Sequence, residues 1–200
     1  DAGSNSHRIS TVATPHAGGY RLNGKKYYIS GVDEADAVLV VARTGIDERT
    51  GRGRLSLFVV DTDAPGLSKD TIDMQILEPE QQYTLYFDNV EVGPDRLIGA
   101  EGEGLRPLFE GLNPERILIA AECIGDAYWF INRASAYAKE RVVFGRPIGQ
   151  NQGVQFPIAD AYIEVEAANL MRFKACNLFD APHPCGAEAN MAKYLAAKAS

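Results

Sequence analysis

Composition changes near residue 100, and this change constrains the fold more than any other feature of the sequence. Residues 1–100 contain segments rich in Val, Tyr, Thr and Gly, whereas residues 101–200 are rich in Ala, Leu, Glu and Arg. The first set favours strands and turns, and the second favours helices. We therefore predict an α+β protein, with a β-domain over residues 1–100 and a helical bundle domain over residues 101–200.

Short strands separated by turns are predicted for the first half. Ala37 to Ala42 and Leu55 to Val60 are continuous apolar segments, and apolar residues alternate with polar ones from Tyr83 to Asp88. Asn23-Gly24 lies between two further strand-like segments and is typical of a tight hairpin turn. Because no helical pattern lies between these strands, we expect an antiparallel β-barrel or sandwich.

A long helix is predicted to open the second half, since apolar residues recur there at steps of three and four. The stripe includes one carboxylate and is made of Leu105, Leu108, Leu112, Glu115 and Ile119. Pro114 cannot donate a backbone hydrogen bond, so the helix is expected to kink or restart there with Asn113 as its N-cap. Glu115 and Arg116 would then lie in a first turn.

Two more helices follow in the expected arrangement. The first helix is predicted to run to about Arg141, with Gly145 as its C-terminal stop. A second runs from near Gln152 to Phe179, and a third opens at Gly186 and is cut at Ser200 without a capping Gly. Short connections between long helices predict an antiparallel bundle, here truncated.

Charge and cysteine content limit the possible partners. A net charge of -7 gives no electrostatic reason to bind nucleic acid or an anionic membrane surface, so we expect neither partner. Cys123, Cys176 and Cys185 contain no C-x-x-C pair and have too few His neighbours for a zinc site, so we expect no metal. They indicate reduced thiols in the cytoplasm, or in the mitochondrial matrix if the source is eukaryotic.

Four motifs together resemble the acyl-CoA dehydrogenase family. They occur in the family's order and are Asp1-Ala2-Gly3-Ser4-Asn5, Asn23 to Gly31, Tyr86 to Val92 and Arg141 to Gln152. The resemblance covers essentially the whole chain. It implies the middle β-domain plus the first part of the C-terminal helical domain of such an enzyme.

The resemblance implies α,β-desaturation of an acyl-CoA thioester with FAD as hydride acceptor. A carboxylate acts as base in this family, and Glu115 matches one of the two positions that supply it. Such a base needs hydrogen-bond reach to the substrate and a pocket that excludes water. The residues alone leave a second interpretation open, because a Glu in a first helical turn is also favoured by the helix dipole.

Other residues are matched to substrate by the same resemblance. Ser4 corresponds to a loop near substrate and flavin, and Asn113 and Arg116 correspond to positions near the thioester chain and the CoA moiety. Asn113 as a helix cap, Arg116 as a solvated helix charge and Ser4 as part of a simple turn remain open alternatives.

Flavin contacts are implied for a strand in the first half. Tyr28, Ile29 and Ser30 match the strand that packs an aromatic ring against the flavin and hydrogen-bonds a hydroxyl to its reactive edge. The family more often has Trp and Thr where this sequence has Tyr28 and Ser30, so flavin packing could differ. Without the resemblance, the segment is an ordinary amphipathic strand.

A second flavin contact is implied across a subunit interface. Arg141, Phe144 and Gln152 match the group that reaches the adenosine diphosphate half of the FAD held by a partner subunit. A guanidinium fork suits a pyrophosphate, although helix termination also accounts for Arg141 and Phe144. The resemblance thus implies a homodimer or homotetramer. No G-x-G-x-x-G motif is present, so FAD is not expected on a Rossmann fold.

Three functions stay open at this point. The first is an acyl-CoA dehydrogenase that passes electrons to an electron-transfer acceptor protein. The second is a related flavin oxidase or monooxygenase on the same scaffold. The third is a catalytically silent subunit or fragment in which the two domains only mediate assembly.

Overall fold

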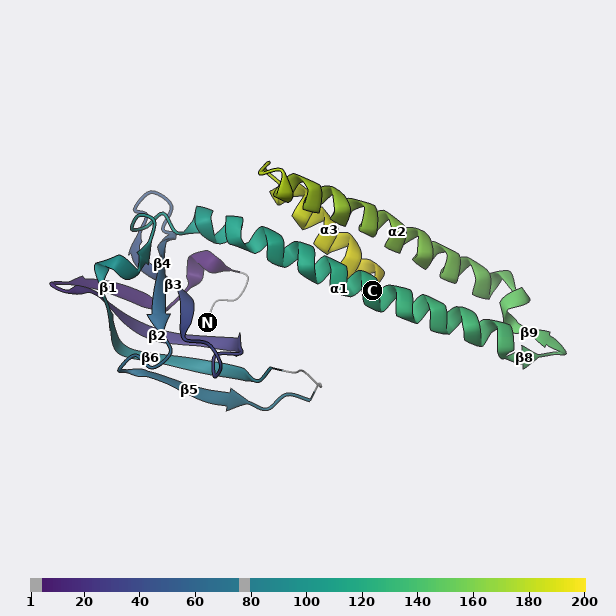
Figure 1. The fold of residues 1–200 in the computed structure, drawn as a ribbon, viewed down its shortest axis with the longest axis horizontal. Helices are drawn as coiled ribbons and strands as arrows, with labels where there is room; N and C mark the ends of the chain where they lie inside the picture. The colour runs from purple at the N-terminus through teal and green to yellow at the C-terminus, as the bar shows by residue number, and fades with distance from the viewer. Residues whose placement is uncertain (1–4, 76–79) are drawn as a thin grey trace. The chain divides into compact units, whose positions relative to one another are not determined.

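The structure is a computed structural model that describes residues 5–75 and 80–200 (Figure 1). The chain divides into two compact units, Asp1–Leu108 and Phe109–Ser200. The first unit holds all strands of a single large sheet, and the second consists of helices with one short hairpin. Ser4, one of the residues matched to substrate, lies outside the described residues.

Seven strands form the sheet of the first unit in the order β5-β6-β2-β1-β3-β4-β7. Their bounds are Val12–His16 for β1, Gly19–Ser30 for β2, Ala37–Ile46 for β3, Gly53–Asp61 for β4, Leu67–Ile72 for β5, Gln82–Val92 for β6 and Leu97–Ile98 for β7. Two 3-10 turns, η1 at Ser6–Arg8 and η2 at Pro94–Arg96, complete it. Among the described strands of this sheet, every pair is antiparallel except β1 with β3.

The predicted fold class, a largely antiparallel β-domain followed by helices, is confirmed. Barrel closure is not observed, because over the described strands the end strands β5 and β7 are not hydrogen-bonded to each other. The core contains the apolar residues of β4 and β6 that the sequence pattern indicated, among them Phe58, Val60, Leu85 and Phe87. The β4 strand is buried on both faces, since even Ser56 is fully buried. This burial explains its continuous apolar sequence.

The hairpin predicted at Asn23-Gly24 is wrong. β2 runs without interruption from Gly19 to Ser30, and the chain reverses at residues 17–18, between β1 and β2. Gly24 instead lies in an irregularity of the pairing with β6, at a φ of 141°. A Cβ there would lie 2.7 Å from the Cα of Thr11. The glycine therefore serves a close approach of two chain segments, which sequence does not distinguish from a turn.

Replacing Gly24 with Ala is expected to lower the unfolding free energy of the β unit by about 2 to 5 kcal/mol, because backbone strain adds to overpacking against Thr11. Gly51→Ala is the matched control. Gly51 also has a positive φ, 66°, but a Cβ at this residue would have no neighbour within 4 Å. This control should cost only about 1 kcal/mol of strain. Urea unfolding of both variants measures the difference, and equal losses would contradict the role of the close approach.

The first helix, α1, is continuous from Leu105 to Glu140 and contains Pro114 in its interior (Figure 1). The predicted restart with Asn113 as cap is therefore wrong, and Glu115 and Arg116 lie within the helix, not in a first turn. Pro114 removes one backbone hydrogen bond. Packing of the following turns compensates, because α1 buries a row of residues further on: Ile117, Ala120, Ile124, Ala127 and Ala138.

A short hairpin connects α1 to the second helix. Its strands are β8, Val142–Val143, and β9, Arg146–Pro147. Phe144 and Gly145 form the two-residue turn, with φ values of 52° and 78°. Two positive φ angles are typical of a type I′ turn. Gly145 as a helix stop is thus wrong, because the helix ends five residues earlier and the glycine is needed for the turn.

The other two helices are α2, Gln152–Asp180, and α3, Gly186–Ala199, as predicted to within one residue. A 3-10 turn, η3 at Ile148–Gln150, precedes α2. Small side chains let the helices pack closely, and the buried residues of α2 and α3 include Ala168, Ala175, Ala189, Ala192 and Ala196. The three cysteines are free.

Large apolar side chains remain uncovered on the helical unit. Tyr162, Leu170 and Phe173 of α2 are 49%, 73% and 52% exposed, and Trp129 of α1 is 56% exposed. The described helices therefore leave several large apolar side chains of α1 and α2 uncovered. Over residues 5–75 and 80–200, no helix combines the length and apolar character that a membrane crossing needs.

Candidate functional site

A β-bulge exposes Tyr28. Lys26 pairs with Leu85 and Ile29 pairs with Tyr83, so that Tyr27 and Tyr28 together lie opposite a single residue of β6. Tyr28 has a φ of 55°, which is uncommon for a large side chain, and it is 65% exposed. Bulges and left-handed residues of this kind are concentrated at functional sites, where they redirect a side chain.

Next to the bulge, Ser30 forms a hydrogen-bonded pair with Gln82. The two residues are register partners at the end of β2 and the start of β6. The Ser30 Oγ lies 3.0 Å from Oε1 and 2.8 Å from Nε2 of Gln82. Ser30 is exposed, whereas Gln82 is 8% exposed. Ile29, between Tyr28 and Ser30, is half-buried and packs against the core.

A half-buried amine lies on the same strand. Lys26 donates from Nζ to the carbonyl oxygen of Val41, at 2.6 Å. Burial lowers the pKa of Lys26 to about 8, because the charged form loses solvation. The strand segment around the bulge therefore carries an amine, an exposed phenol ring and a hydroxyl within a short stretch of sequence.

Three predicted residues of the helical unit lie close together on α1. Arg116 donates from Nη1 to Oδ1 of Asn113, at 3.2 Å, and its guanidinium lies 5.5 Å from the ring centre of Phe109. Glu115 is exposed, as are Leu118 and Glu122 further along the helix. The structure thus joins Asn113 to Arg116 and leaves the Glu115 carboxylate in solvent.

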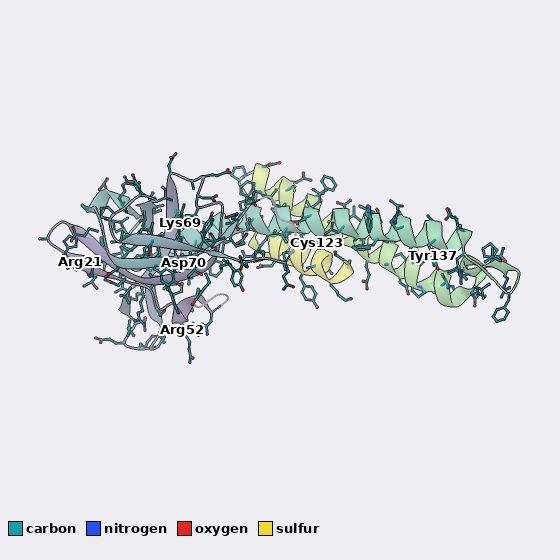
Figure 2. All side chains as sticks on the ribbon, turned by 90° about the horizontal axis from the view of Figure 1, so that it is seen from below. Arg21, Arg52, Lys69, Asp70, Cys123 and Tyr137 are labelled. Carbon is teal, nitrogen blue, oxygen red and sulfur yellow. The ribbon has the colours of Figure 1, made fainter. Side chains whose placement is uncertain are left out.

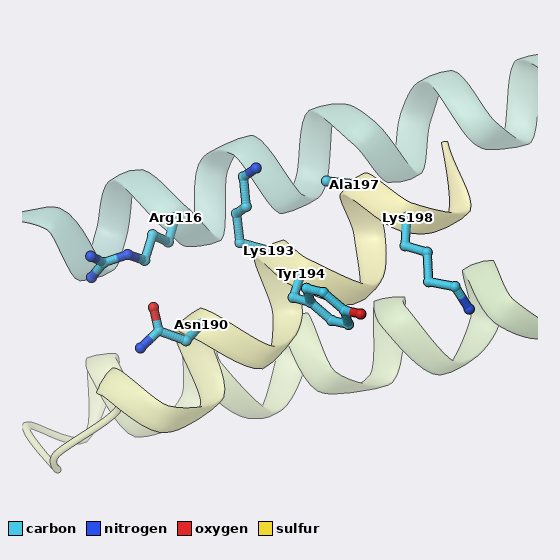
Figure 3. A pocket seen from close by; sticks show the side chains of 6 residues that line it. All are labelled: Arg116, Asn190, Lys193, Tyr194, Ala197 and Lys198. Carbon is cyan, nitrogen blue, oxygen red and sulfur yellow. The ribbon is translucent and has the colours of Figure 1, made fainter. Parts of the chain in front are cut away.

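Arg116 lines a groove between α1 and α3 that has a volume of about 370 Å³. Figure 3 shows Arg116 extending from α1, and Lys193 and Tyr194 extending from α3. The remaining lining residues are Asn190, Ala197 and Lys198. Lys198 is paired with Glu164 of α2, at 3.2 Å. The groove therefore presents cations beside an exposed aromatic ring, although the protein as a whole is acidic.

Arg141, Phe144 and Gln152 surround the hairpin between α1 and α2. Phe144, at the tip, is 102% exposed, so it makes no packing contact with the described chain around it. The interpretation of Phe144 as the hydrophobic contact of a helix end is therefore wrong. The Arg141 carbonyl accepts a hydrogen bond from the backbone N–H of Ile148 at 2.8 Å, which ties the start of the hairpin to its end. The side chain of Arg141 is exposed.

A cavity of about 300 Å³ in the β unit involves residues that carried no prediction. Its lining includes His7, Asp47, Arg52 and Arg54, and Figure 2 labels Arg52. Among the described residues, the buried Nδ1 of His7 has no hydrogen-bond partner. The sequence signal that could have revealed this cavity is the alternation of Arg with Gly from Gly51 to Arg54, since guanidinium groups beside a tight turn suit anions.

In the part of the chain that the structure describes, no three side chains of His, Cys, Asp and Glu are grouped to hold a metal ion. The predicted residues instead form three sites, each within one unit. Tyr28, Ile29 and Ser30 lie on β2, Asn113, Glu115 and Arg116 lie on α1, and Arg141, Phe144 and Gln152 lie around the hairpin.

Profiles of one protein family match almost the whole chain. The acyl-CoA dehydrogenase middle domain matches residues 1–90, and the acyl-CoA dehydrogenase C-terminal domain matches residues 102–200. The acyl-CoA dehydrogenase FadE12 of Mycobacterium tuberculosis is 48% identical over 202 residues, which include 100% of this chain and 52% of that protein. The chain therefore spans about half the length of the curated relatives that it matches.

Solved structures share the fold. The glutaryl-coenzyme A dehydrogenase glutaryl-CoA complex is 35% identical with a TM-score of 0.84, over 100% of this chain and 50% of that one. PigA with FAD and proline is 27% identical with a TM-score of 0.86, over 100% of this chain and 52% of that one. The two family profiles, the relative at 48% identity and the shared fold all indicate the same family. This chain belongs to the acyl-CoA dehydrogenase family.

Proposed function

We propose that this chain is part of an FAD-dependent acyl-CoA dehydrogenase, which converts an acyl-CoA thioester into its α,β-unsaturated product. The observation that carries the proposal is the β-bulge, which exposes the ring of Tyr28 two residues before the exposed hydroxyl of Ser30. An aromatic face and a hydroxyl so close together fit the flat ring of a flavin and its polar edge. Family membership supports this interpretation.

The hairpin residues fit the other half of the cofactor. The exposed guanidinium of Arg141 suits the pyrophosphate, and Phe144 offers a flat surface that nothing in its own unit covers. A fully exposed aromatic ring on a two-residue turn is suited to contact with another protein surface. We propose that Arg141, Phe144 and Gln152 hold the FAD of a partner subunit, which requires a homodimer or homotetramer.

In the proposed reaction, the Glu115 carboxylate accepts the proton from the carbon next to the thioester carbonyl. A hydride leaves the neighbouring carbon, and the electron pair of the broken C–H bond next to the carbonyl forms the new double bond. When bound, FAD supplies the hydride acceptor. Because Glu115 is exposed, the proposal requires that the bound substrate and adjoining protein surface exclude water from this side of α1.

Substrate and partners follow from the same scheme. The cations of the α1–α3 groove, Arg116 and Lys193, support binding of an anionic substrate such as a CoA thioester. Asn113 holds the Arg116 guanidinium in place, and Ser4 remains a proposed substrate contact. Electrons would leave through an electron-transfer acceptor protein, in the cytoplasm or the mitochondrial matrix.

The flavin spectrum tests the proposal. Purified protein is expected to be yellow, to lose its visible absorption on anaerobic addition of a suitable acyl-CoA, and to reduce an artificial electron acceptor. A series of acyl-CoA thioesters of different chain length and branching serves as the probe. Rapid oxygen consumption without that acceptor would favour an oxidase or monooxygenase. Protein without flavin, and with no response to any thioester, would favour a silent assembly subunit.

A further inference from the structure

We propose that Gln82 is a positioning residue that holds the Ser30 hydroxyl and controls where its proton points. The inference rests on the proposed function, in which this hydroxyl hydrogen-bonds the reactive edge of the flavin. It concerns a residue on another strand, for which the sequence motifs implied no role. The pair Ser30 and Gln82 lies next to the bulge that exposes Tyr28.

The Gln82 amide fixes the position of Ser30 Oγ on the side that faces β6. Both polar atoms of the Gln82 amide lie within 3.0 Å of Ser30 Oγ, so the amide can accept the hydroxyl proton through Oε1 while donating from Nε2 to Oγ. This cyclic arrangement holds whichever way the amide is flipped, because both atoms are in reach. The outer side of Ser30 is exposed and open to a ligand.

The two hydrogen bonds have different consequences when a ligand acceptor approaches. The hydroxyl has one proton and two lone pairs. Its proton can turn from Oε1 toward the acceptor, while the Nε2–H bond to Oγ stays and keeps the oxygen in position. Gln82 therefore holds the proton before a ligand binds and orients the donor once the ligand is bound.

Burial makes an amide specifically useful at this position. Gln82 is 8% exposed at the start of a strand on which Tyr83 and Leu85 are in the core. A buried amide must keep its hydrogen bonds, so its place relative to Ser30 is well defined. A carboxylate of the same shape can only accept hydrogen bonds. The Ser30 hydroxyl would then donate its hydrogen bond to the carboxylate, and it would not be free to donate to a ligand.

The test compares three variants of the flavin-loaded protein. Gln82→Glu keeps the shape and removes the donor, Gln82→Met removes both polar atoms, and Ser30→Ala removes the hydroxyl. We expect Gln82→Glu to shift the visible flavin band and the flavin midpoint potential in the same direction as Ser30→Ala. It should slow substrate-dependent flavin reduction by about tenfold, as for the loss of one hydrogen bond. Gln82→Met should change the flavin band, the midpoint potential and the reduction rate less, because the Ser30 hydroxyl proton remains available to the flavin in this variant.

Gln81→Glu is the matched control, because it makes the same chemical change at the exposed neighbouring residue. It should leave spectrum and potential unchanged. The inference is overturned if Ser30→Ala changes the spectrum and Gln82→Glu does not, or if Gln82→Met has the larger effect, as a purely structural role would give. If wild-type protein binds no flavin, the proposed function itself fails, and melting temperatures of the variants then report only on folding.

Discussion

The Glu115→Gln variant is expected to retain FAD and to lose substrate-dependent bleaching of the flavin, with a reduction rate lower by about 10³-fold or more. The amide keeps the size of the side chain but cannot accept a proton, and general bases contribute about 10² to 10⁴ in rate. Stopped-flow absorbance under anaerobic conditions measures the reduction rate. Flavin content and thioester binding should stay close to wild type, because the substitution removes a proton acceptor and no packed group.

Glu122→Gln is the matched control for this result. Glu122 is an exposed carboxylate about two turns further along α1, so it reports any general effect of removing charge from that part of the helix. This variant should reduce flavin at the wild-type rate. If Glu115→Gln also bleaches normally, the base is another carboxylate, and the proposed role of Glu115 is withdrawn.

Replacing Arg141 with Ala is expected to weaken FAD binding by about 10- to 100-fold, the effect of losing one hydrogen-bonded charge contact to a pyrophosphate. Since the arginine acts in the neighbouring subunit under the proposal, loss of flavin should be accompanied by weaker self-association. The flavin retained after ultrafiltration measures the first effect, and sedimentation measures the second. Arg141→Lys should recover only part of the affinity, because an ammonium lacks the planar fork of the guanidinium.

Lys139→Ala is the control for charge. Lys139 is an exposed cation in the last turn of the same helix, two residues from Arg141. Its replacement should leave FAD binding as in the unmodified protein. Equal flavin loss in Lys139→Ala and Arg141→Ala would mean that the helix end contributes only general positive charge. If Arg141→Ala binds flavin as well as the unmodified protein does, the proposal that the hairpin is part of the cofactor site is contradicted.

Most of the secondary structure was predictable from the sequence because it depends on local patterns. The continuous apolar segments at Ala37 to Ala42 and Leu55 to Val60 lie in β3 and β4, and the helix predicted from Gln152 to Phe179 is α2. Such patterns indicate which face of a helix or strand is apolar and must be buried, and they do so independently of what that face packs against. The division into strands followed by helices is a consequence of the same signal.

Three of the errors share one cause, which is that Gly and Pro are each compatible with more than one local conformation. Gly24 permits a hairpin or a close approach, and packing against Thr11 selected the second. Gly145 permits a helix stop or a hairpin turn, and the pairing of β8 with β9 selected the turn. Pro114 is compatible with a break, yet the helix continues through it because later turns of α1 are buried. Local sequence cannot rank these choices.

For the candidate site, sequence alone determined which chemical groups are available, since the resemblance named Tyr28, Ser30, Glu115 and Arg141 from motifs. Only the tertiary structure decided their surroundings. It paired Ser30 with Gln82 across 52 residues of sequence and left Glu115 exposed. The physical reason is that a motif specifies side chains in chain order, whereas burial and hydrogen bonding depend on strands and helices that are distant in the chain and meet only in the fold.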